Sequence, residues 1–179
     1  MISLSGFGYE DTLKNPSKAF ARTWHSRSFI NGPAVKEFEK KFAEYCEADS
    51  CVALSSCTSA LHLSLLALGV GPGDEVITVP YTWVSTVEVI KQVGATPVFV
   101  DIALNDMCID PREVAKKISK KTKAIIGVDL YGNICDIDEL KKFNVPVIQD
   151  SAQSTGAYYK NKRVGSVADL TCFSFYPTK

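Results

Sequence analysis

The sequence predicts an α/β fold in which helices cover both faces of a mostly parallel sheet. Short runs rich in Val, Ile and Phe alternate along the chain with segments whose apolar residues recur every three or four positions. Within the runs, apolar residues occupy successive positions, so both faces of each strand should be buried. The expected strands cover residues 51–54, 75–80, 96–102, 123–130, 146–150 and 170–175.

Three helices are expected in the first half of the chain. The first begins after Gly32-Pro33, and the second covers residues 58–68. The third covers residues 82–93 and ends at Gly94, because glycine readily adopts the left-handed conformation that closes many helices. The apolar face of the first helix is formed by Val35, Phe38, Phe42 and Tyr45.

Two later helices have recognisable starts. Asp110 is suited to an N-cap, Pro111 takes the first helical position, and Glu113 follows the cap by three residues, as in a capping box. A short fifth helix should begin near Asp136. The chain shows no internal repeat and no linker rich in Pro, Gly and Ser, so we expect one domain.

The composition is that of a soluble globular domain, with 46% hydrophobic residues and a net charge of zero. Zero net charge argues against a nucleic-acid partner and against an anionic membrane surface. The longest apolar stretch, residues 60–70, is much shorter than the roughly 20 residues that cross a bilayer. The N-terminus lacks the pattern of a secretory signal, and the six cysteines form no Cys-x-x-Cys pair. We therefore expect reduced thiols, no metal site and a cytoplasmic location.

Polar residues follow several expected strands at their carboxyl ends, where open parallel sheets bind ligands. Residues 55–59, Ser-Ser-Cys-Thr-Ser, lead from the first strand into a helix. The free amides of that helix start, together with Thr58 and Ser59, could hold a phosphate. The alternative is that these hydroxyl groups only cap the helix.

Trp83 and Asp150 follow two other strands. The Trp83 indole could stack on a planar heterocycle, or it could pack against a neighbouring helix. The Asp150 carboxylate, followed by Ser151-Ala152-Gln153, could bind a buried cation or a protonated ring nitrogen. Its alternative role is to cap the next helix.

Ser174 and Lys179 lie on either side of the exit from the last strand. An amine in a partly desolvated site near other positive charge has a lowered pKa and attacks carbonyl carbon, whereas a solvated terminal lysine is inert. Taken together, the candidates provide an anion cradle, a stacking plane, a carboxylate, a hydroxyl group and an amine. Pyridoxal phosphate (PLP) requires this combination.

The sequence also resembles the DegT/StrS type of PLP-dependent sugar aminotransferases, which have the fold-type I architecture. The resemblance spans nearly the whole chain, in family order. The matching stretches are Asn31-Gly32-Pro33 with Phe38-Glu39, residues 55–68, Gly71-Pro72-Gly73-Asp74-Glu75-Val76, residues 94–101, Leu130-Tyr131-Gly132, Asp150-Ser151-Ala152-Gln153 and residues 172–179.

The resemblance implies a role for each candidate. Lys179 would hold the cofactor covalently and later move a proton between the substrate Cα and the cofactor C4′. Asp150 would pair with the pyridinium nitrogen, Gln153 would contact the ring near O3, and Trp83 would stack on the ring. Substrates would be keto-sugars carried on nucleotides, with glutamate as amino donor, in a homodimer with shared active sites. The phosphate would be bound by Thr58, Ser59 and Ser174.

The chain departs from the family pattern at two positions and in length. The family usually has Gly where this chain has Cys57, which places a Cβ near the phosphate, and often His where it has Asp129. Family members continue past the lysine, so residues 1–179 would be the N-terminal portion of the PLP-binding large domain, without the C-terminal small domain. We expect weak cofactor binding and little turnover from the chain alone.

Two alternatives to the aminotransferase remain open. One is the dehydratase branch of the family, which uses pyridoxamine phosphate (PMP), but that branch replaces the lysine by His, so Lys179 argues against it. The other is a truncated homologue that binds a sugar nucleotide or a partner protein without catalysis. Borohydride trapping of the cofactor on Lys179 would favour an enzyme.

Overall fold

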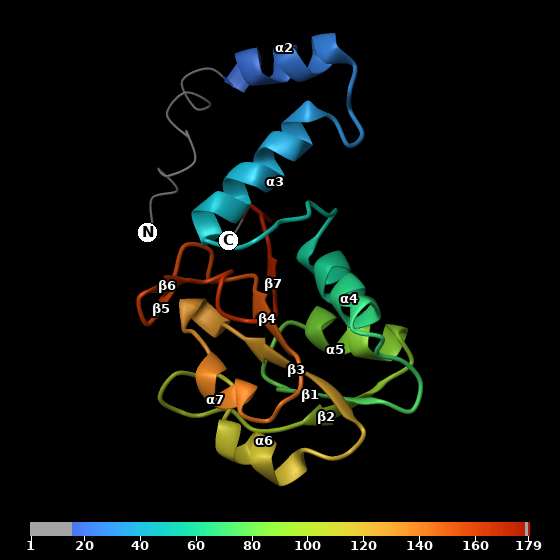
Figure 1. Ribbon diagram of the computed structural model, residues 1–179, viewed down its shortest axis with the longest axis vertical. Coiled ribbons are helices and arrows are strands. Elements are labelled where there is room, and N and C mark those ends of the chain that lie inside the picture. The colour runs from blue at the N-terminus through green and yellow to red at the C-terminus, as the bar shows by residue number, and fades with distance from the viewer. Residues whose placement is uncertain (1–15, 178) are drawn as a thin grey trace. The chain divides into compact units, whose positions relative to one another are not determined.

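The computed structural model describes residues 16–177 and 179. The chain forms two compact units, Met1–Ala53 and Leu54–Lys179 (Figure 1). The described part of the first unit contains helices α2 (Pro16–Ser26) and α3 (Pro33–Cys46). Helix α3 was predicted and begins one residue earlier than expected, with Pro33 in its first turn, whereas α2 was not predicted.

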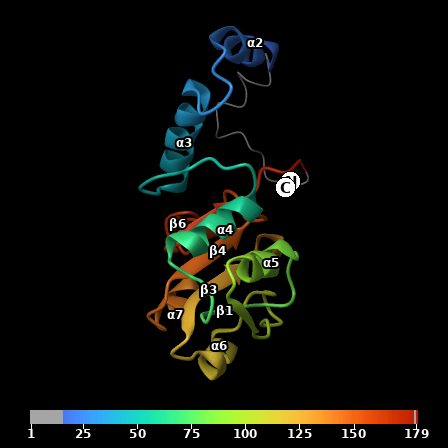
Figure 2. The ribbon, with the colours of Figure 1, turned by 90° about the vertical axis from the view of Figure 1, so that its right-hand side faces the viewer.

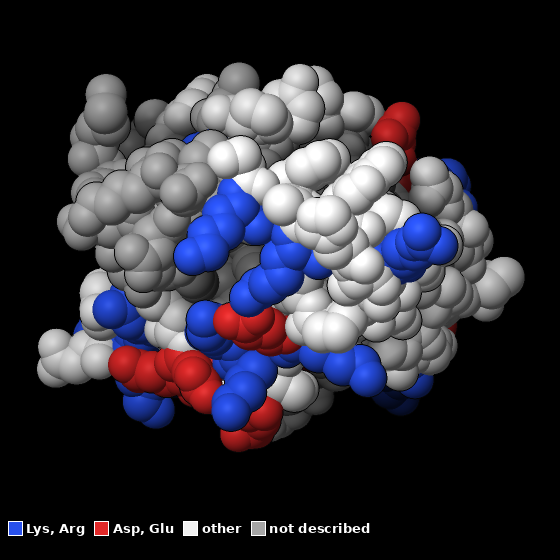
Figure 3. All heavy atoms as spheres, turned by 90° about the horizontal axis from the view of Figure 1, so that it is seen from above, with Lys and Arg blue, Asp and Glu red and all other residues white. Residues whose placement is uncertain are grey.

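Some charged side chains of the first unit form ion pairs on its surface. Glu37 on α3 pairs with Arg22 at 3.3 Å and with Lys41 at 2.8 Å. The hydrogen bond from Lys41 and the positive charges of both partners lower the pKa of Glu37. Basic and acidic side chains lie next to one another on the face drawn in Figure 3, in keeping with the zero net charge.

The second unit is built on a five-stranded parallel sheet, which confirms the predicted fold class. The strand order is β2-β1-β3-β4-β7, and every neighbouring pair is parallel. The strands are β1 (Glu75–Thr78), β2 (Thr96–Phe99), β3 (Thr122–Val128), β4 (Val147–Ser151) and β7 (Leu170–Phe173). The helices are α4 (Cys57–Ala67), α5 (Ser85–Gln92), α6 (Pro111–Lys117) and α7 (Ile137–Lys141), with the 3-10 turn η1 (Leu130–Gly132) after β3.

Helices cover both faces of this sheet. In Figure 1, α4 and α5 lie to one side of the strands and α6 and α7 to the other, and Figure 2 looks onto α4 and α5 with the strands behind them. Successive strand residues alternate between two cores. Ile126 and Ile148 pack with the residues of α4 and α5, whereas Ile125 and Val147 pack with those of α6 and α7.

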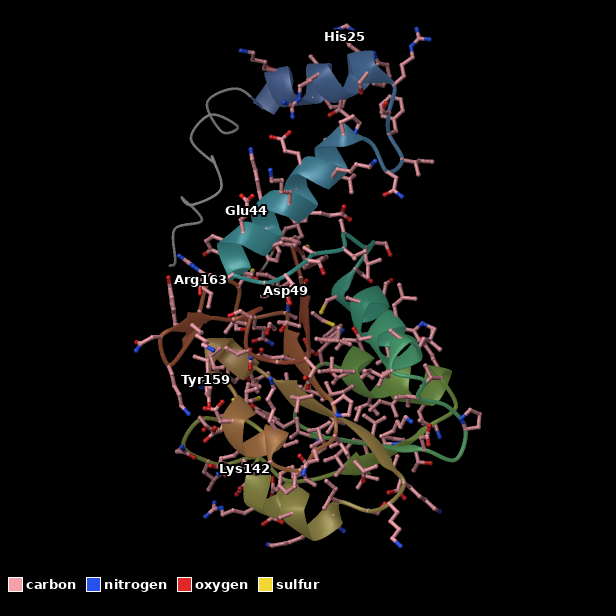
Figure 4. All side chains as sticks on the ribbon, viewed as in Figure 1. His25, Glu44, Asp49, Lys142, Tyr159 and Arg163 are labelled. Carbon is pink, nitrogen blue, oxygen red and sulfur yellow. The ribbon has the colours of Figure 1, made fainter. Side chains whose placement is uncertain are left out.

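A hairpin of β5 (Tyr158–Tyr159) and β6 (Lys162–Arg163) follows β4 and was not predicted (Figure 4). The hydroxyl of Tyr159 donates to Asp136 Oδ1 at 2.6 Å. Asp136 also caps α7, since its side chain accepts from the backbone amide of Glu139. The hairpin is thereby joined to the N-terminus of that helix.

The predicted strand at residues 51–54 is wrong. This segment has no regular secondary structure and pairs with no described strand, and Val52 and Leu54 are 72% and 41% exposed. The amide of Ala53 donates to the Glu39 side chain at 2.8 Å instead of to another strand. A β-prone run becomes a strand only where a neighbouring backbone is free to pair with it.

Helix ends differ from the prediction by one residue at each end of α4 and by three residues at the start of α5. Helix α5 begins at Ser85 rather than at residue 82, because residues 80–82 form a bend after β1. Asp110 caps α6 as predicted, accepting from the amide of Arg112 at 2.8 Å. Glu113 pairs with Lys116 instead of closing a capping box. Among the described residues, no helix combines the length and apolar character needed to span a bilayer.

Candidate cofactor site

Asp150 lies at the carboxyl end of β4, in the interior of the sheet. In register it is opposite Val128 on β3 and Cys172 on β7. Its side chain is only 5% exposed. β4 has a strand on each side, β3 and β7, and this interior position buries the carboxylate although it stands near the end of its strand (Figure 1).

Three groups donate to the Asp150 carboxylate. Thr86 Oγ1 donates to Oδ2 at 2.9 Å, the Ala152 amide donates to Oδ1 at 3.3 Å, and Cys57 Sγ lies 3.8 Å from Oδ1. Burial raises the pKa of Asp150, while these donors and the positive charge of Lys179 lower it in part. In the described part of the chain after Asp150 there is no helix, so the alternative that it caps one is not observed. A protonated ring nitrogen beside the carboxylate would offset the cost of burying its charge.

The serines at the start of α4 act partly as caps. Ser56 is the N-cap, and its Oγ accepts from the amide of Ser59 at 3.0 Å. Ser59 Oγ lies 3.0 Å from both Ser55 Oγ and Ser56 Oγ. Capping therefore explains Ser56, while the amides of Cys57 and Thr58, earlier in the first turn, are donors suited to an anion.

Cys57 and Trp83 lie near this edge in different surroundings. The Cys57 thiol is half-buried, and burial together with the Asp150 charge raises its pKa well above the usual range. Trp83 is 72% exposed in the turn before α5, so the alternative that it packs against a helix is not observed. An exposed indole is free to stack on a ligand.

Gln153 is oriented by the turn after β3. Its Oε1 accepts from the backbone amide of Tyr131 at 2.9 Å. Because Oε1 of Gln153 accepts this bond, its Nε2 group points away from Tyr131 and is available as a donor. Tyr131 has a φ of 57°, and its hydroxyl lies 3.1 Å from that of Tyr81, which follows β1.

Ser174 and Lys179 follow β7. Ser174 is half-buried, and its Oγ accepts from the amide of Tyr176 at 3.3 Å. The Lys179 side chain is exposed, and its backbone amide donates to the Tyr176 carbonyl at 2.9 Å. Burial raises the pKa of both Asp150 and Cys57, and the positive charge of Lys179 opposes this in small part.

Sequence reasoning missed two residues of this region. Thr86 was assigned only to a helix, although its hydroxyl lies 3.0 Å from that of Thr82, one turn earlier, and donates to Asp150. The i, i+4 spacing of two threonines just after a strand was a usable signal. Asp129 was noted only as a departure from the family, but it is fully buried and accepts four hydrogen bonds.

Comparison with known proteins gives the family. The DegT/DnrJ/EryC1/StrS aminotransferase family matches residues 11–179. The chain belongs to this family. The spore coat polysaccharide biosynthesis protein SpsC of Bacillus subtilis is 42% identical over 170 residues, which are 93% of this chain and 44% of that protein. The UDP-2-acetamido-2-deoxy-3-oxo-D-glucuronate aminotransferase of Pseudomonas aeruginosa is 44% identical over 155 residues, 84% of this chain and 43% of that enzyme.

Solved structures of relatives agree with the fold. DesV of Streptomyces venezuelae, in complex with a ketimine intermediate, has a TM-score of 0.90 at 38% identity and covers 96% of this chain and 47% of DesV. NtdA of Bacillus subtilis, with bound cofactor PMP, has a TM-score of 0.87 at 32% identity and covers 94% of this chain and 39% of NtdA. The chain thus spans less than half the length of these relatives.

Proposed function

We propose that the protein containing this chain is a PLP-dependent aminotransferase that moves an amino group from glutamate to the keto carbon of a nucleotide-linked sugar. The products would be 2-oxoglutarate and the corresponding amino-sugar. The observation that carries the proposal is the buried Asp150 carboxylate at the carboxyl end of β4, which accepts hydrogen bonds from Thr86 and Ala152. A carboxylate for the ring nitrogen and an amine for the reactive carbon are the two groups that PLP chemistry needs most.

Each candidate residue has a binding or proton-transfer task in this proposal. When bound, the cofactor supplies an electron sink that weakens the bonds at the substrate's amino-bearing carbon. Asp150 keeps a positive charge on the ring nitrogen, Gln153 donates from Nε2 near O3, and Trp83 covers one face of the ring. Lys179 attaches the cofactor and moves the proton. The phosphate is held by the first turn of α4 with Thr58, Ser59 and Ser174.

The names of relatives support the substrate class. Besides the Pseudomonas enzyme, similar proteins include the dTDP-3-amino-3,4,6-trideoxy-alpha-D-glucose transaminase of Streptomyces venezuelae, at 38% identity, and the GDP-perosamine synthase of Caulobacter vibrioides, at 41% identity. These names share a sugar linked to a nucleoside diphosphate. The nucleotide itself differs among them, so the proposal is limited to the class.

The proposal extends to organisation and location. Residues 1–179 would contribute the N-terminal portion of a PLP-binding large domain, and the protein would act as a homodimer with shared sites. Four of its six cysteines, Cys46, Cys108, Cys135 and Cys172, are buried as thiols, which supports a reducing cytoplasm.

The test uses the protein expressed from its complete gene, loaded with PLP. Mass spectrometry of a reaction with glutamate and a nucleotide-linked keto-sugar should find 2-oxoglutarate and amino-sugar in equal amounts. Lys179→Ala should form neither product. Tight binding of the sugar nucleotide without amino transfer, by protein that retains PLP, would contradict the proposal and favour a binding protein.

A further inference from the structure

Asp129 is a buried carboxylate to which the proposed chemistry assigns no task. It follows β3, and none of its surface is exposed. Its Oδ2 accepts from Ser154 Oγ at 2.7 Å, Ser151 Oγ at 2.8 Å and Gln149 Nε2 at 2.9 Å. Its Oδ1 accepts from the amide of Cys135 at 3.1 Å. Four donors directed at one side chain are best matched by an ionised carboxylate, which is an acceptor only.

The side chains that donate to Asp129 surround Asp150 in the sequence. Gln149 and Ser151 are its immediate neighbours on β4, and side chains alternate along a strand. Asp150 therefore points to the face where it meets Thr86 and Cys57, while its neighbours point to the opposite face and meet Asp129. Asp129 therefore holds β4 through Gln149 and Ser151, the two residues on either side of Asp150, on the face opposite to the one that Asp150 occupies.

The same carboxylate also holds the turn that carries Gln153. Ser154, the residue after Gln153, donates to Asp129. The backbone of the two segments is joined as well, because the amide of Asp129 donates to the Asp150 carbonyl at 3.0 Å, and the amide of Tyr131 donates to Gln153 Oε1 at 2.9 Å. The end of β3 and the turn after β4 thus form one connected unit.

We infer that Asp129 is a positioning residue for the cofactor: its carboxylate fixes the end of β4 and the following turn, so that Asp150 and Gln153 meet the ring together. The inference rests on the proposed function, because it assumes that these two residues contact PLP. Asp129 does not touch the cofactor. It acts through Gln149, Ser151 and Ser154, in the way that supporting groups orient the residues of other sites.

The test compares Asp129→Asn with the wild type and with a matched control. An amide at residue 129 places a donor against the groups that donate to Oδ2. The control is Asp110→Asn, which also removes a carboxylate of low exposure, 7%, but at the cap of α6. The measurements are thermal stability, amide hydrogen exchange of residues 150–154 without cofactor, the PLP dissociation constant, and the visible circular dichroism of bound PLP, which reports ring orientation.

Asp129→Asn should speed exchange of the turn, raise the PLP dissociation constant at least about tenfold and change the dichroism of the bound ring. Asp110→Asn should leave the exchange rate, the PLP dissociation constant and the dichroism unchanged, even if it lowers the Tm as much as Asp129→Asn does. If Asp129→Asn lowers the Tm but leaves exchange, affinity and dichroism as in the wild type, Asp129 is structural only and the inference is overturned.

Two further outcomes are also decisive. If Asp129→Asn does not fold, Ser151→Ala and Ser154→Ala take its place, since each removes one donor and leaves the carboxylate. Unchanged PLP affinity and dichroism in both would overturn the inference. Wild-type protein that takes up no PLP would overturn the proposed function and the inference together. If the wild type binds PLP and the variants bind it with the same affinity and dichroism, only the inference is overturned.

Discussion

The hydroxyl of Thr86 donates to Oδ2 of Asp150 at 2.9 Å, and both side chains are buried. The bond joins α5 to the end of β4 across 64 positions of sequence. It fixes one carboxylate oxygen on the helix side, while the backbone amide of Ala152 approaches the other oxygen at 3.3 Å. The carboxylate therefore has a defined orientation before any ligand arrives.

Replacing Thr86 by Val keeps the shape of the side chain and removes the donor. Because the Thr86 hydrogen bond lowers the pKa of Asp150, Thr86→Val should raise that pKa further and leave the carboxylate less fixed. We expect weaker PLP binding, by about tenfold, and a stability loss of about 1 kcal/mol. Absorbance titration with PLP and urea unfolding measure the two effects. Equal PLP affinity in the variant and the wild type would show that the bond has no functional role.

Asp150→Asn should stabilise the cofactor-free protein at neutral pH. Burial raises the pKa of Asp150, so the folded state binds its proton more tightly than the unfolded state does. Stability is therefore lost as pH rises from the unfolded value, near 3.8, through the raised folded value. Asparagine carries no charge, so the stability that Asp150→Asn gains over the wild type should be largest at pH 7 and should shrink on acidification.

The control for this pH dependence is Asp110→Asn, which should have the opposite sign. The Arg112 guanidinium beside Asp110 lowers the pKa of that carboxyl, so its ionised form stabilises the fold above the unfolded pKa. Asp110→Asn should lower the stability of the protein at pH 7, and this loss of stability should vanish as pH falls through the lowered pKa of Asp110. Thermal unfolding from pH 7 down to pH 2 measures both variants. An Asp150→Asn variant that is less stable than the wild type at pH 7, with a deficit that shrinks on acidification, would contradict the burial argument.

Ser59→Ala should weaken the binding of PLP but not of pyridoxal, which has no phosphate. Ser59 Oγ stands in the first turn of α4, next to Ser55 and Ser56. A hydrogen bond to a charged group contributes roughly 1.5 to 3 kcal/mol, so the PLP dissociation constant should rise about tenfold or more. Titration of both ligands gives the ratio that isolates the phosphate. A matching loss for pyridoxal would place Ser59 away from the phosphate.

PLP binding should quench the fluorescence of Trp83. The indole is 72% exposed and therefore available to stack on the ring. The chain has a second tryptophan, Trp24, which provides the matched control. Trp83→Phe should abolish the quenching, and Trp24→Phe should retain it. Quenching that survives in Trp83→Phe would remove Trp83 from the proposed site.

The parts of the fold that depend on local sequence were predictable. Asp110 before Pro111 and the apolar runs of the sheet each specify their own conformation, and the structure contains them. The segment 51–54 was not predictable in the same way, because strand propensity does not reveal whether a neighbouring backbone will pair with it. Instead, the Glu39 side chain accepts from the amide of Ala53.

The candidate site shows the same division. Asp150 and Lys179 were found because strand ends and chemically reactive side chains are visible in sequence. Thr86 and Asp129 were not assigned to the site, since their partners come from other elements: Thr86 is 64 positions from Asp150, and the side chains that donate to Asp129 are 20 to 25 positions away. Supporting contacts of this kind depend on tertiary structure rather than on local pattern.

The central claim is that PLP binds between Asp150 and Lys179, and borohydride reduction tests it most directly. Protein incubated with PLP, reduced and digested should carry the reduced cofactor on the peptide that contains Lys179. Lys179→Arg, which keeps the charge, should carry none, and Asp150→Asn should carry less. Cofactor spread over exposed lysines such as Lys160, or equal labelling of Lys179→Arg, would contradict the claim.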